Sequence, residues 1–195
     1  MKRILLASGS PRRKMLLEWA EVPFEVIVSD ADESFSATIS PAEVAVSIAK
    51  KKNDAVVAQL EDKIANSIVI SADTIVVLNN EIIGKPSDRE EAIQIIQKLS
   101  GQTHLVITAV NICDAEKNIS FHDTTEVVFH NLTTEQIVHY VDNYKPFDKA
   151  GAYAIQEWIG VVGIASIRGD FYNVMGLPVS RVLKSLKEDF RYVLK

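Results

Sequence analysis

Short apolar runs rich in β-branched residues alternate along the chain with segments in which apolar residues recur every three or four positions. The first pattern is typical of a buried strand and the second of an amphipathic helix. The runs predict strands over residues 3–7, 24–28, 67–78, 103–113, 121–129 and 159–167. The helical spacing predicts helices over residues 11–20, 41–60, 87–99, 133–143 and 179–186. This alternation predicts an α/β class with a sheet that is either mixed or fully parallel.

The predicted helices begin at residues that favour capping. Ser10 precedes Pro11, and a serine followed by proline at the first helical position is a strong helix start. Ser40, with Glu43 three residues later, has the pattern of a capping box. The spacing places three apolar side chains on one face of the first helix: Met15, Leu16 and Trp19.

Composition and charge exclude several classes of protein. The chain has 195 residues, enough for a substantial core, and we expect a single domain over residues 1–195. The net charge of -5 argues against a nucleic-acid partner, which needs an excess of lysine and arginine. No apolar run is long enough to cross a bilayer, so no membrane partner is expected.

The single cysteine and the first residues predict the compartment. Cys113 cannot form an internal disulfide, suits a reducing compartment, and lies in an apolar run that favours an inert core role. The apolar run after Arg3 stops after four residues, which favours a first strand over a signal peptide. We therefore expect a cytoplasmic protein.

The first candidate site is the turn at residues 8–13, Ser-Gly-Ser-Pro-Arg-Arg, between a strand and a helix. The N-terminus of a helix presents backbone N–H groups and a positive dipole end, which together bind phosphate. Arg12 and Arg13 add guanidinium groups that bind phosphate oxygens in a bidentate fork. The alternative is a capped helix with two solvated arginines.

The second candidate is Asp73, which interrupts an otherwise apolar stretch. A buried carboxylate needs a partner, a metal or exposure at a strand end, which makes Asp73 the best single candidate for catalysis. The alternative is a turn aspartate with local hydrogen bonds. Asp30, Asp32 and Glu33 form an acidic cluster, and one of them could hold Mg²⁺ or Mn²⁺ together with Asp73. The alternative for this cluster is a solvated loop.

Lysines and one small-residue loop complete the candidates. Lys50, Lys51 and Lys52 point about 100° apart on a helix, so at most two of them face one pocket. Lys85 lies in a Gly-Lys-Pro turn held by its proline. In the loop over residues 148–156, Gln156 can read a base edge through its amide, and the alternative is a β-turn with a core tyrosine.

Taken in order, these segments resemble the Maf family of nucleotide pyrophosphatases. Six blocks in register carry the resemblance: residues 6–13, 71–76, 84–86, 100–104, 148–153 and 172–178. The resemblance implies an elongated mixed β-sheet flanked by helices, with two lobes around a cleft, similar to the inosine triphosphate pyrophosphatases. It implies hydrolysis of a nucleoside triphosphate to the monophosphate and pyrophosphate with a divalent metal, and it suggests a homodimer.

The resemblance also implies roles for individual residues. It implies that Asp73 is the proton acceptor, that Glu33 joins Asp73 in holding the metal, and that Lys52 and Lys85 act on the phosphates. The phosphate-binding turn is implied to use Ser8, Arg12 and Arg13.

Three residues resemble the positions that set base choice in the branch acting on dTTP and UTP: Arg12, Thr74 and Gln156. The alternatives are a pyrophosphatase for 7-methyl-GTP and a non-catalytic nucleotide-binding regulator of cell division and septum formation. The chain departs from the commoner family pattern at Ala154 and at residues 157–158, where glycine is frequent.

Overall fold

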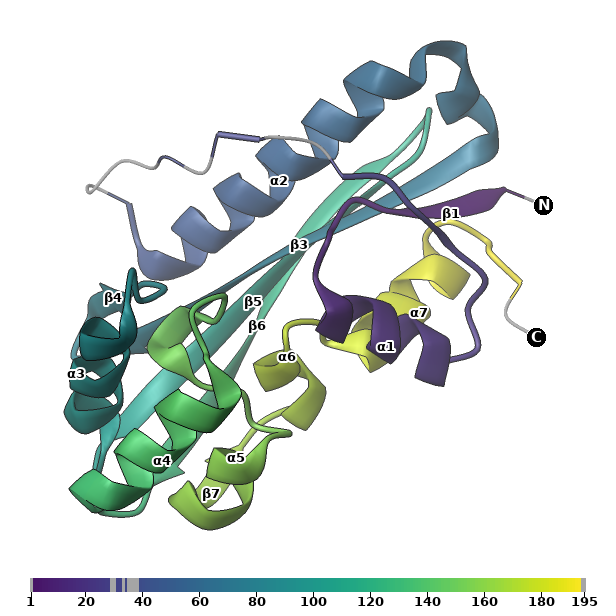
Figure 1. Ribbon diagram of the computed structural model, residues 1–195. Helices are drawn as coiled ribbons and strands as arrows, with labels where there is room; N and C mark the ends of the chain where they lie inside the picture. Colours follow the sequence, from purple (N-terminus) through teal and green to yellow (C-terminus); the bar gives the residue numbers. More distant parts are fainter. Residues whose placement is uncertain (1, 29–30, 33, 35–38, 194–195) are drawn as a thin grey trace. The chain divides into compact units, whose positions relative to one another are not determined.

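The computed structural model describes residues 2–28, 31–32, 34 and 39–193 (Figure 1). Its elements in chain order are β1 (Arg3–Leu6), α1 (Pro11–Trp19), β2 (Glu25–Val26), α2 (Pro41–Leu60), η1 (Glu61–Asn66), β3 (Ser67–Leu78), β4 (Glu81–Ile83), α3 (Arg89–Leu99), β5 (Thr103–Cys113), β6 (Asn118–Phe129), α4 (Thr134–Tyr144), η2 (Ala150–Ala152), α5 (Trp158–Gly163), β7 (Ile164–Arg168), α6 (Phe171–Met175) and α7 (Val179–Glu188).

The strands form one seven-stranded mixed sheet. Its order is β2-β1-β3-β5-β6-β7, and β4 pairs with β3. β1 lies parallel to both β2 and β3, with Leu6 opposite Ile70, whereas β4 and β7 are antiparallel to their neighbours. The predicted α/β class is therefore confirmed, with the mixed form of the sheet.

The chain forms two compact units along this sheet. Unit 1 contains the described residues of 1–73, 108–123 and 176–195, and unit 2 contains residues 74–107 and 124–175. Three strands pass from one unit into the other, and β3 does so between Asp73 and Thr74. The single domain over residues 1–195 and the cleft between two lobes stay predictions.

In unit 1, helix α2 packs its apolar side against strands of the sheet. Its N-terminus carries the predicted capping box, in which Ser40 Oγ accepts from Glu43 N and the Glu43 carboxylate accepts from Ser40 N. Val56 and Leu60, one turn apart, join a core cluster with Leu5 and Val69. Because burying such side chains is the main stabilising term of a fold, this contact holds α2 in place.

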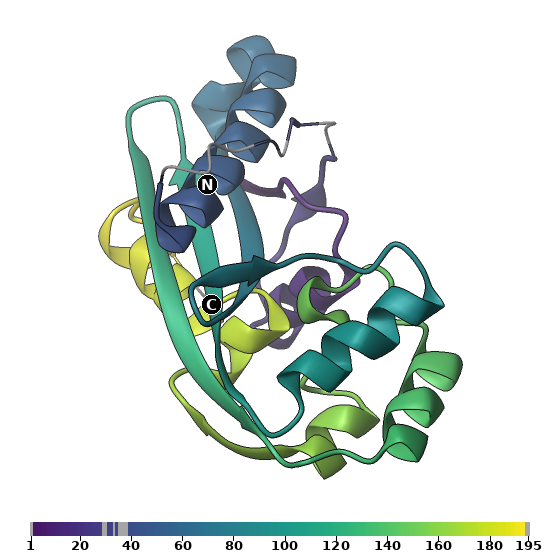
Figure 2. The same ribbon diagram turned by 90° about the vertical axis from the view of Figure 1, so that its left-hand side faces the viewer.

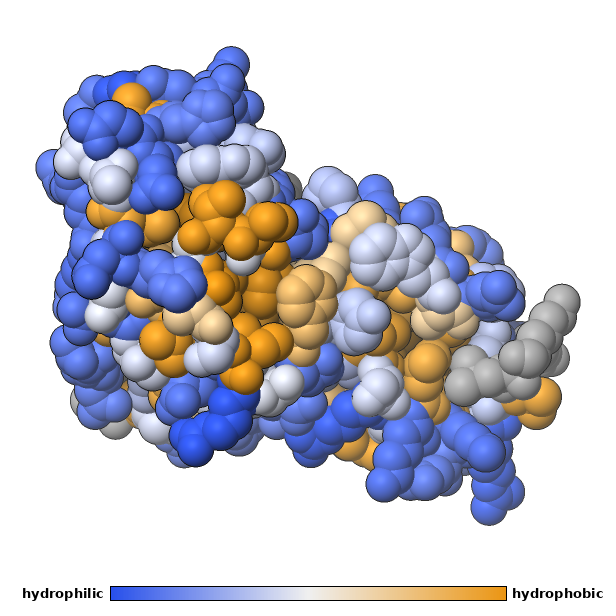
Figure 3. Space-filling model, turned by 90° about the horizontal axis from the view of Figure 1, so that it is seen from below, coloured by the Kyte–Doolittle hydropathy of each residue, from blue (hydrophilic) through white to orange (hydrophobic). Residues whose placement is uncertain are grey.

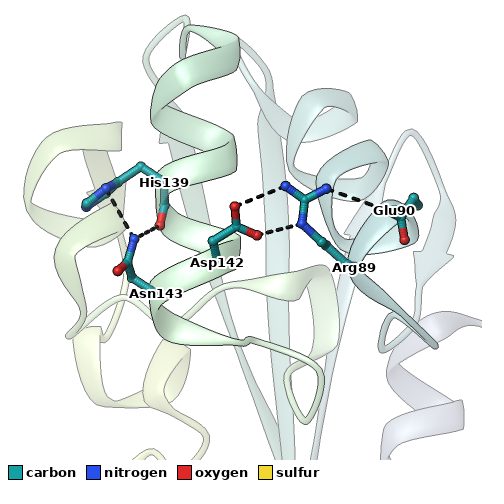
Figure 4. A network of polar contacts seen from close by, with 5 residues as sticks. All are labelled: Arg89, Glu90, His139, Asp142 and Asn143. Atoms are coloured by element: carbon teal, nitrogen blue, oxygen red, sulfur yellow. Dashed lines mark hydrogen bonds and ion pairs between the residues drawn. The ribbon is translucent and has the colours of Figure 1, made fainter.

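In unit 2, α3 and α4 lie side by side, as Figure 2 shows. Arg89 at the start of α3 donates from Nε and Nη2 to the two carboxylate oxygens of Asp142 on α4, at 2.6 and 3.0 Å (Figure 4). This bidentate pair raises the pKa of Arg89 further above its ordinary value. A capping box of Thr133 and Gln136 starts α4.

The strand predicted over residues 159–167 is wrong in its first half. Residues 158–163 form helix α5, and β7 begins only at Ile164. Ile159 and Gly163 are buried while Val161 is 82% exposed, so burial recurs every four positions as in a helix. An apolar run of this length does not distinguish a strand from a short helix by periodicity.

Smaller differences concern α1 and its surroundings. Trp19 is 60% exposed, and the buried face of α1 consists of Arg13, Leu16 and Leu17 instead of the predicted set. Ser10 is the N-cap residue, but its side chain makes no capping hydrogen bond with any described residue. The predicted strand over 24–28 shortens to Glu25–Val26, the two residues in register with β1, and Ile27 N adds one hydrogen bond of 3.1 Å to the carbonyl of Leu6.

Apolar side chains also reach the surface. Figure 3 shows such side chains gathered on one face of the molecule. Among the described residues, no helix combines the length and the apolar character needed to cross a bilayer. The homodimer suggested by the family resemblance stays a prediction.

Candidate functional site

Asp73 and Lys52 form a nearly buried ion pair in unit 1. Asp73 is only 8% exposed, and its Oδ1 accepts a hydrogen bond of 2.7 Å from Lys52 Nζ on α2. A carboxylate withdrawn from water is costly unless it is paired. Of the three possibilities expected for this aspartate, a partner, a metal or exposure at a strand end, the structure shows a partner, Lys52.

Buried polar contacts fix the register of α2 on β3. Ser71 Oγ donates to the carbonyl of Ala49 at 2.7 Å, and Asn53 Nδ2 donates to the carbonyls of Val69 and Asn111 at 3.2 and 3.1 Å. Ser71 and Asp73 lie two residues apart, so their side chains leave the strand on the same face. These contacts therefore place the turn of α2 that carries Lys52 against the face of β3 that carries Asp73.

Cys113 supports the same contact between helix and sheet. Its Sγ donates to Asn53 Oδ1 at 2.9 Å, and burial raises the pKa of the thiol to about 11. The thiolate is the reactive form of cysteine, so a raised pKa makes Cys113 inert. The predicted core role of Cys113 is confirmed.

The three consecutive lysines separate as predicted. Lys52 faces Asp73, while Lys50 is exposed and Lys51 Nζ donates to the carbonyl of Ser34 at 2.7 Å. Asp32 accepts hydrogen bonds from the Ser34 side chain and backbone, which lower the pKa of Asp32. Asp32 therefore makes local loop contacts.

Asp30 and Glu33 lie outside the described residues, so the predicted role of Glu33 stays a prediction. Within the part of the chain that the structure describes, no group of three or more His, Cys, Asp or Glu side chains could hold a metal.

The Ser-Gly-Ser-Pro-Arg-Arg turn leaves the end of β1 near the middle of β3, where Asp73 lies. Ala7 N donates to the carbonyl of Ile70 at 2.7 Å, so the turn leaves β1 beside the segment of β3 that leads to Asp73. Carboxyl ends of neighbouring parallel strands are where α/β folds place ligands. The structure thus brings two candidate groups of unit 1 close together at the carboxyl end of β1.

Arg13 has a structural role within this turn. Its side chain is buried, its Nε donates to the carbonyl of Gly176 at 2.8 Å, and its Nη1 donates to Ser8 Oγ at 3.1 Å. Ser8 Oγ also accepts from Ser10 N at 3.2 Å. Arg13 therefore shapes the turn and ties it to the segment before α7, whereas Arg12 is half-buried.

The unit 2 candidates are organised around Gly151. The backbone N of Gly151 donates to the carbonyl of Gly84 at 3.0 Å, and a Cβ on Gly151 would lie 2.9 Å from Val76 Cγ2. Val76 lies two residues after Thr74, on the same face of β3. The loop of Gln156 and the turn of Lys85 therefore meet along the face of β3 that carries Thr74.

Exposure separates these candidates from their surroundings. Thr74 is the single half-buried residue of β3, whose other eleven positions are buried. Lys85 and Gln156 are both exposed, and Gln156 follows five consecutive buried residues, 151–155. All three side chains are therefore at least partly accessible.

Two side-chain networks of unit 2 were missed from the sequence. His104 Nε2 lies 2.7 Å from Tyr153 Oη, within a cluster of edge-to-face rings completed by Phe129. Tyr140 Oη is hydrogen-bonded to the carboxylate of Glu157. For the contact of His104 with Tyr153, the sequence indicated only a core position for Tyr153, which is confirmed. The contact of Tyr140 with Glu157 has no signal in the sequence spacing.

The chain is similar to known proteins over nearly its whole length. The family model of the Maf-like proteins matches residues 3–189. A dTTP/UTP pyrophosphatase of Cytophaga hutchinsonii is 49% identical over 187 residues, covering 96% of this chain and 84% of that one. A dTTP/UTP pyrophosphatase of Bacillus cereus is 47% identical over 188 residues, covering 96% of both chains.

A solved structure, that of the Staphylococcus aureus Ham1 protein, is 18% identical with a TM-score of 0.44, covering 67% of this chain and 73% of that one. The family assignment does not rest on this weaker likeness. It rests on the family match over residues 3–189 and on relatives nearly half identical along almost the whole chain, and on these grounds the chain belongs to the Maf family.

Proposed function

We propose that this chain hydrolyses dTTP and UTP to the nucleoside monophosphate and pyrophosphate. The observation that carries the proposal is the nearly buried pair of Asp73 and Lys52, beside the end of β1 where the turn of residues 8–13 begins. The names of the two relatives support the substrate class. Hydrolysis of a triphosphate needs a proton acceptor for the attacking water and cations for the phosphates, and the candidate residues include both.

Asp73 is proposed to accept the proton of the attacking water. A general base must carry a lone pair toward the water, and a carboxylate has two oxygens with which to do so. Lys52 Nζ donates to Oδ1 of this carboxylate. A triphosphate would attract the ammonium of Lys52, which then neutralises charge on the phosphates while Asp73 engages the water.

The turn of residues 8–13 and Lys85 are proposed to bind the triphosphate. The N-terminus of α1 offers the positive end of its dipole, and Arg12 and Arg13 add fixed positive charge there. Ser8 already accepts two hydrogen bonds, so its remaining O–H proton is available as a donor. Exposed Lys85 supplies a further cation for the phosphates.

Thr74 and Gln156 are proposed to read the base, together with Arg12. Uracil and thymine present an N–H donor beside a carbonyl acceptor. The amide of Gln156 offers the complementary acceptor and donor. Thr74 is half-buried on the face of β3 against which the loop of Gln156 packs. This position supports a role in base recognition for both residues.

A divalent cation is proposed as the cofactor, Mg²⁺ or Mn²⁺, held by Asp73 and Glu33. The described residues fit the mode in which such ions take one or two carboxylates and complete their shell with substrate phosphates, because Asp73 is a hard oxygen donor near the turn that is proposed to bind the phosphates. When bound, the cation would offset negative charge on the phosphate oxygens. We also propose a cytoplasmic location, in keeping with the single buried Cys113.

The test is release of pyrophosphate from a panel of nucleotides. The protein is incubated with dTTP, UTP, CTP, GTP and 7-methyl-GTP in the presence of Mn²⁺, with Asp73→Asn as the control for contaminating activity. We expect pyrophosphate from dTTP and UTP at rates well above those of the other substrates. A protein that binds nucleotides but releases no pyrophosphate would be a regulator, and preference for 7-methyl-GTP would place it in the other branch.

A further inference from the structure

Gln156 lies in a turn whose backbone is held on both sides. Glu157 N donates to the carbonyl of Ala154 at 3.1 Å, and Gly160 N donates to the carbonyl of Glu157 at 2.9 Å. A Cβ on Gly160 would lie 1.7 Å from the carbonyl oxygen of Ile155, so helix α5 packs directly on the residue before Gln156. The exposed side chain of Gln156 therefore extends from a closely packed turn of the backbone.

Tyr140 connects the two sides of this turn. Its fully buried side chain comes from α4, and its Oη accepts a hydrogen bond of 3.2 Å from Ala154 N while donating to Glu157 Oε2. One hydroxyl thus bridges the residue two before Gln156 and the residue immediately after it. A hydrogen bond to a carboxylate is among the stronger ones in a protein, which makes the bridge a firm constraint.

Lys149, at the start of the same loop, also contacts Glu157. This lysine is buried, its Nζ donates to Asp148 Oδ1 at 2.7 Å, and it lies 3.6 Å from Glu157 Oε1. The carboxylate of Glu157 therefore meets a hydroxyl on one oxygen and an ammonium on the other. These contacts join both ends of the loop over residues 148–157.

The helix that carries Tyr140 is itself anchored. The bidentate pair of Arg89 and Asp142 joins α4 to α3 (Figure 4), and the ring of Tyr144 stacks on that of Tyr140 with centroids 5.0 Å apart. Tyr140 therefore reaches the turn from a fixed position, and the turn takes its geometry from α4.

We propose that Glu157 and Tyr140 are positioning residues that hold the turn of Gln156 and thereby set its choice of base. The inference rests on the proposed function. The amide of glutamine presents an acceptor and a donor, and a half-turn about its last bond exchanges them. A uracil or thymine ring requires one arrangement and a cytosine ring the reverse, so selectivity needs a turn that holds the amide in one arrangement.

The test compares Tyr140→Phe with Tyr144→Phe, the same change one helical turn later. We expect Tyr140→Phe to lower the ratio of kcat/KM for dTTP to that for CTP by about tenfold, because a site loses discrimination when its hydrogen-bonding groups are no longer held in place. The change should fall on KM for dTTP more than on kcat. Tyr144→Phe should keep the wild-type ratio.

Variants of Glu157 separate its hydrogen bond from its charge. Glu157→Gln retains an oxygen that accepts from Tyr140 and should keep most of the discrimination, whereas Glu157→Leu should lose it as Tyr140→Phe does. Wild-type ratios in folded Tyr140→Phe and Glu157→Leu would overturn the inference and leave the proposed function intact.

Hydrogen exchange in the nucleotide-free protein tests the inference apart from catalysis. We expect the backbone amides of residues 155–157 to exchange faster in Tyr140→Phe than in the wild type or in Tyr144→Phe, since a lost constraint lets the turn open more often. Equal exchange in all three proteins would overturn the positioning role whatever nucleotide is hydrolysed. A wild type that releases no pyrophosphate from any nucleotide would instead overturn the proposed function and the inference with it.

Discussion

Lys52 Nζ donates a hydrogen bond of 2.7 Å to Asp73 Oδ1, joining the middle of α2 to the middle of β3. Both side chains are largely withdrawn from water, at 17% and 12% exposure. Removing one partner leaves an uncompensated charge, so loss of either residue is expected to lower stability.

The first prediction concerns Asp73 itself. Asp73→Asn removes the proposed proton acceptor while keeping the size of the side chain, and kcat for dTTP should fall by about a thousandfold, within the range of general-base contributions. Pyrophosphate release measures the effect, and circular dichroism checks that the variant is folded. A folded Asp73→Asn protein that hydrolyses dTTP at the wild-type rate would contradict the role of Asp73.

The second prediction compares two neighbouring lysines. Lys52→Met leaves the carboxylate of Asp73 without its cation and should reduce the free energy of unfolding by about 2 kcal/mol, besides raising KM for dTTP. Lys50→Met, the same change at an exposed position of α2, should stay within about 0.5 kcal/mol of the wild type. Urea unfolding of the three proteins gives the comparison, and equal losses in both variants would argue against the pair.

The third prediction compares two glycines. Gly160→Ala places a methyl group where the carbonyl of Ile155 lies and should cost at least about 2 kcal/mol of stability, besides weakening the preference for dTTP. No described atom lies within 4 Å of a Cβ added to Gly84, so Gly84→Ala should stay within about 0.5 kcal/mol. Thermal unfolding distinguishes them, and a fully stable Gly160→Ala protein would contradict the close packing of α5 on Ile155.

The fourth prediction concerns stability at acid pH. Burial lowers the pKa of His104 to about 4, from an ordinary value near 6.5, so the folded protein keeps this ring neutral. Below pH 6.5 the unfolded chain binds a proton at His104, whereas the folded protein binds it only as the pH approaches 4. His104 therefore contributes its full stabilisation above pH 6.5 and loses it as the pH falls toward 4, by about 3 kcal/mol at most.

The double variant His104→Phe/Tyr153→Phe measures this contribution. It replaces both partners of the buried hydrogen bond by apolar rings, which avoids leaving one polar group unpaired. Its free energy of unfolding should depend less on pH between 6.5 and 4 than that of the wild type, by about one proton. Identical pH dependence of the two proteins would show that His104 titrates normally.

Strong local patterns were sufficient for much of the fold. The bounds of α2, β3 and β5 match the predicted ranges because each carries a long periodic or apolar pattern, and α2 adds a capping box. The run over residues 159–167 was misread because nine apolar and small residues suit a strand or a short helix equally well. The short elements β4 and α6 carry too few residues to produce a pattern at all.

For the candidate site, the sequence indicated the residue types, whereas the packing of the chain decided their contacts. Motifs were enough to select Ser8, Lys52, Asp73 and Lys85 as residue types suited to phosphate chemistry. Helical geometry predicted that one or two of three lysines would face a pocket, but the packing of α2 on β3 decided that Lys52 meets Asp73. The bond from Arg13 to Gly176 spans 163 positions of the chain, which no local pattern encodes.

The sequence by itself therefore determined the α/β class, the long elements and the membership in the Maf family, and it supplied the candidate residues for phosphate binding. It did so because these depend on residue type and on spacing within a few turns or strands. Tertiary structure alone decided which groups meet: the Arg13 side chain with the backbone carbonyl of Gly176, and Tyr140 with Glu157 across the turn of Gln156. Such meetings depend on how distant segments pack, because burial and hydrogen-bond satisfaction are settled over the whole core and not along the chain.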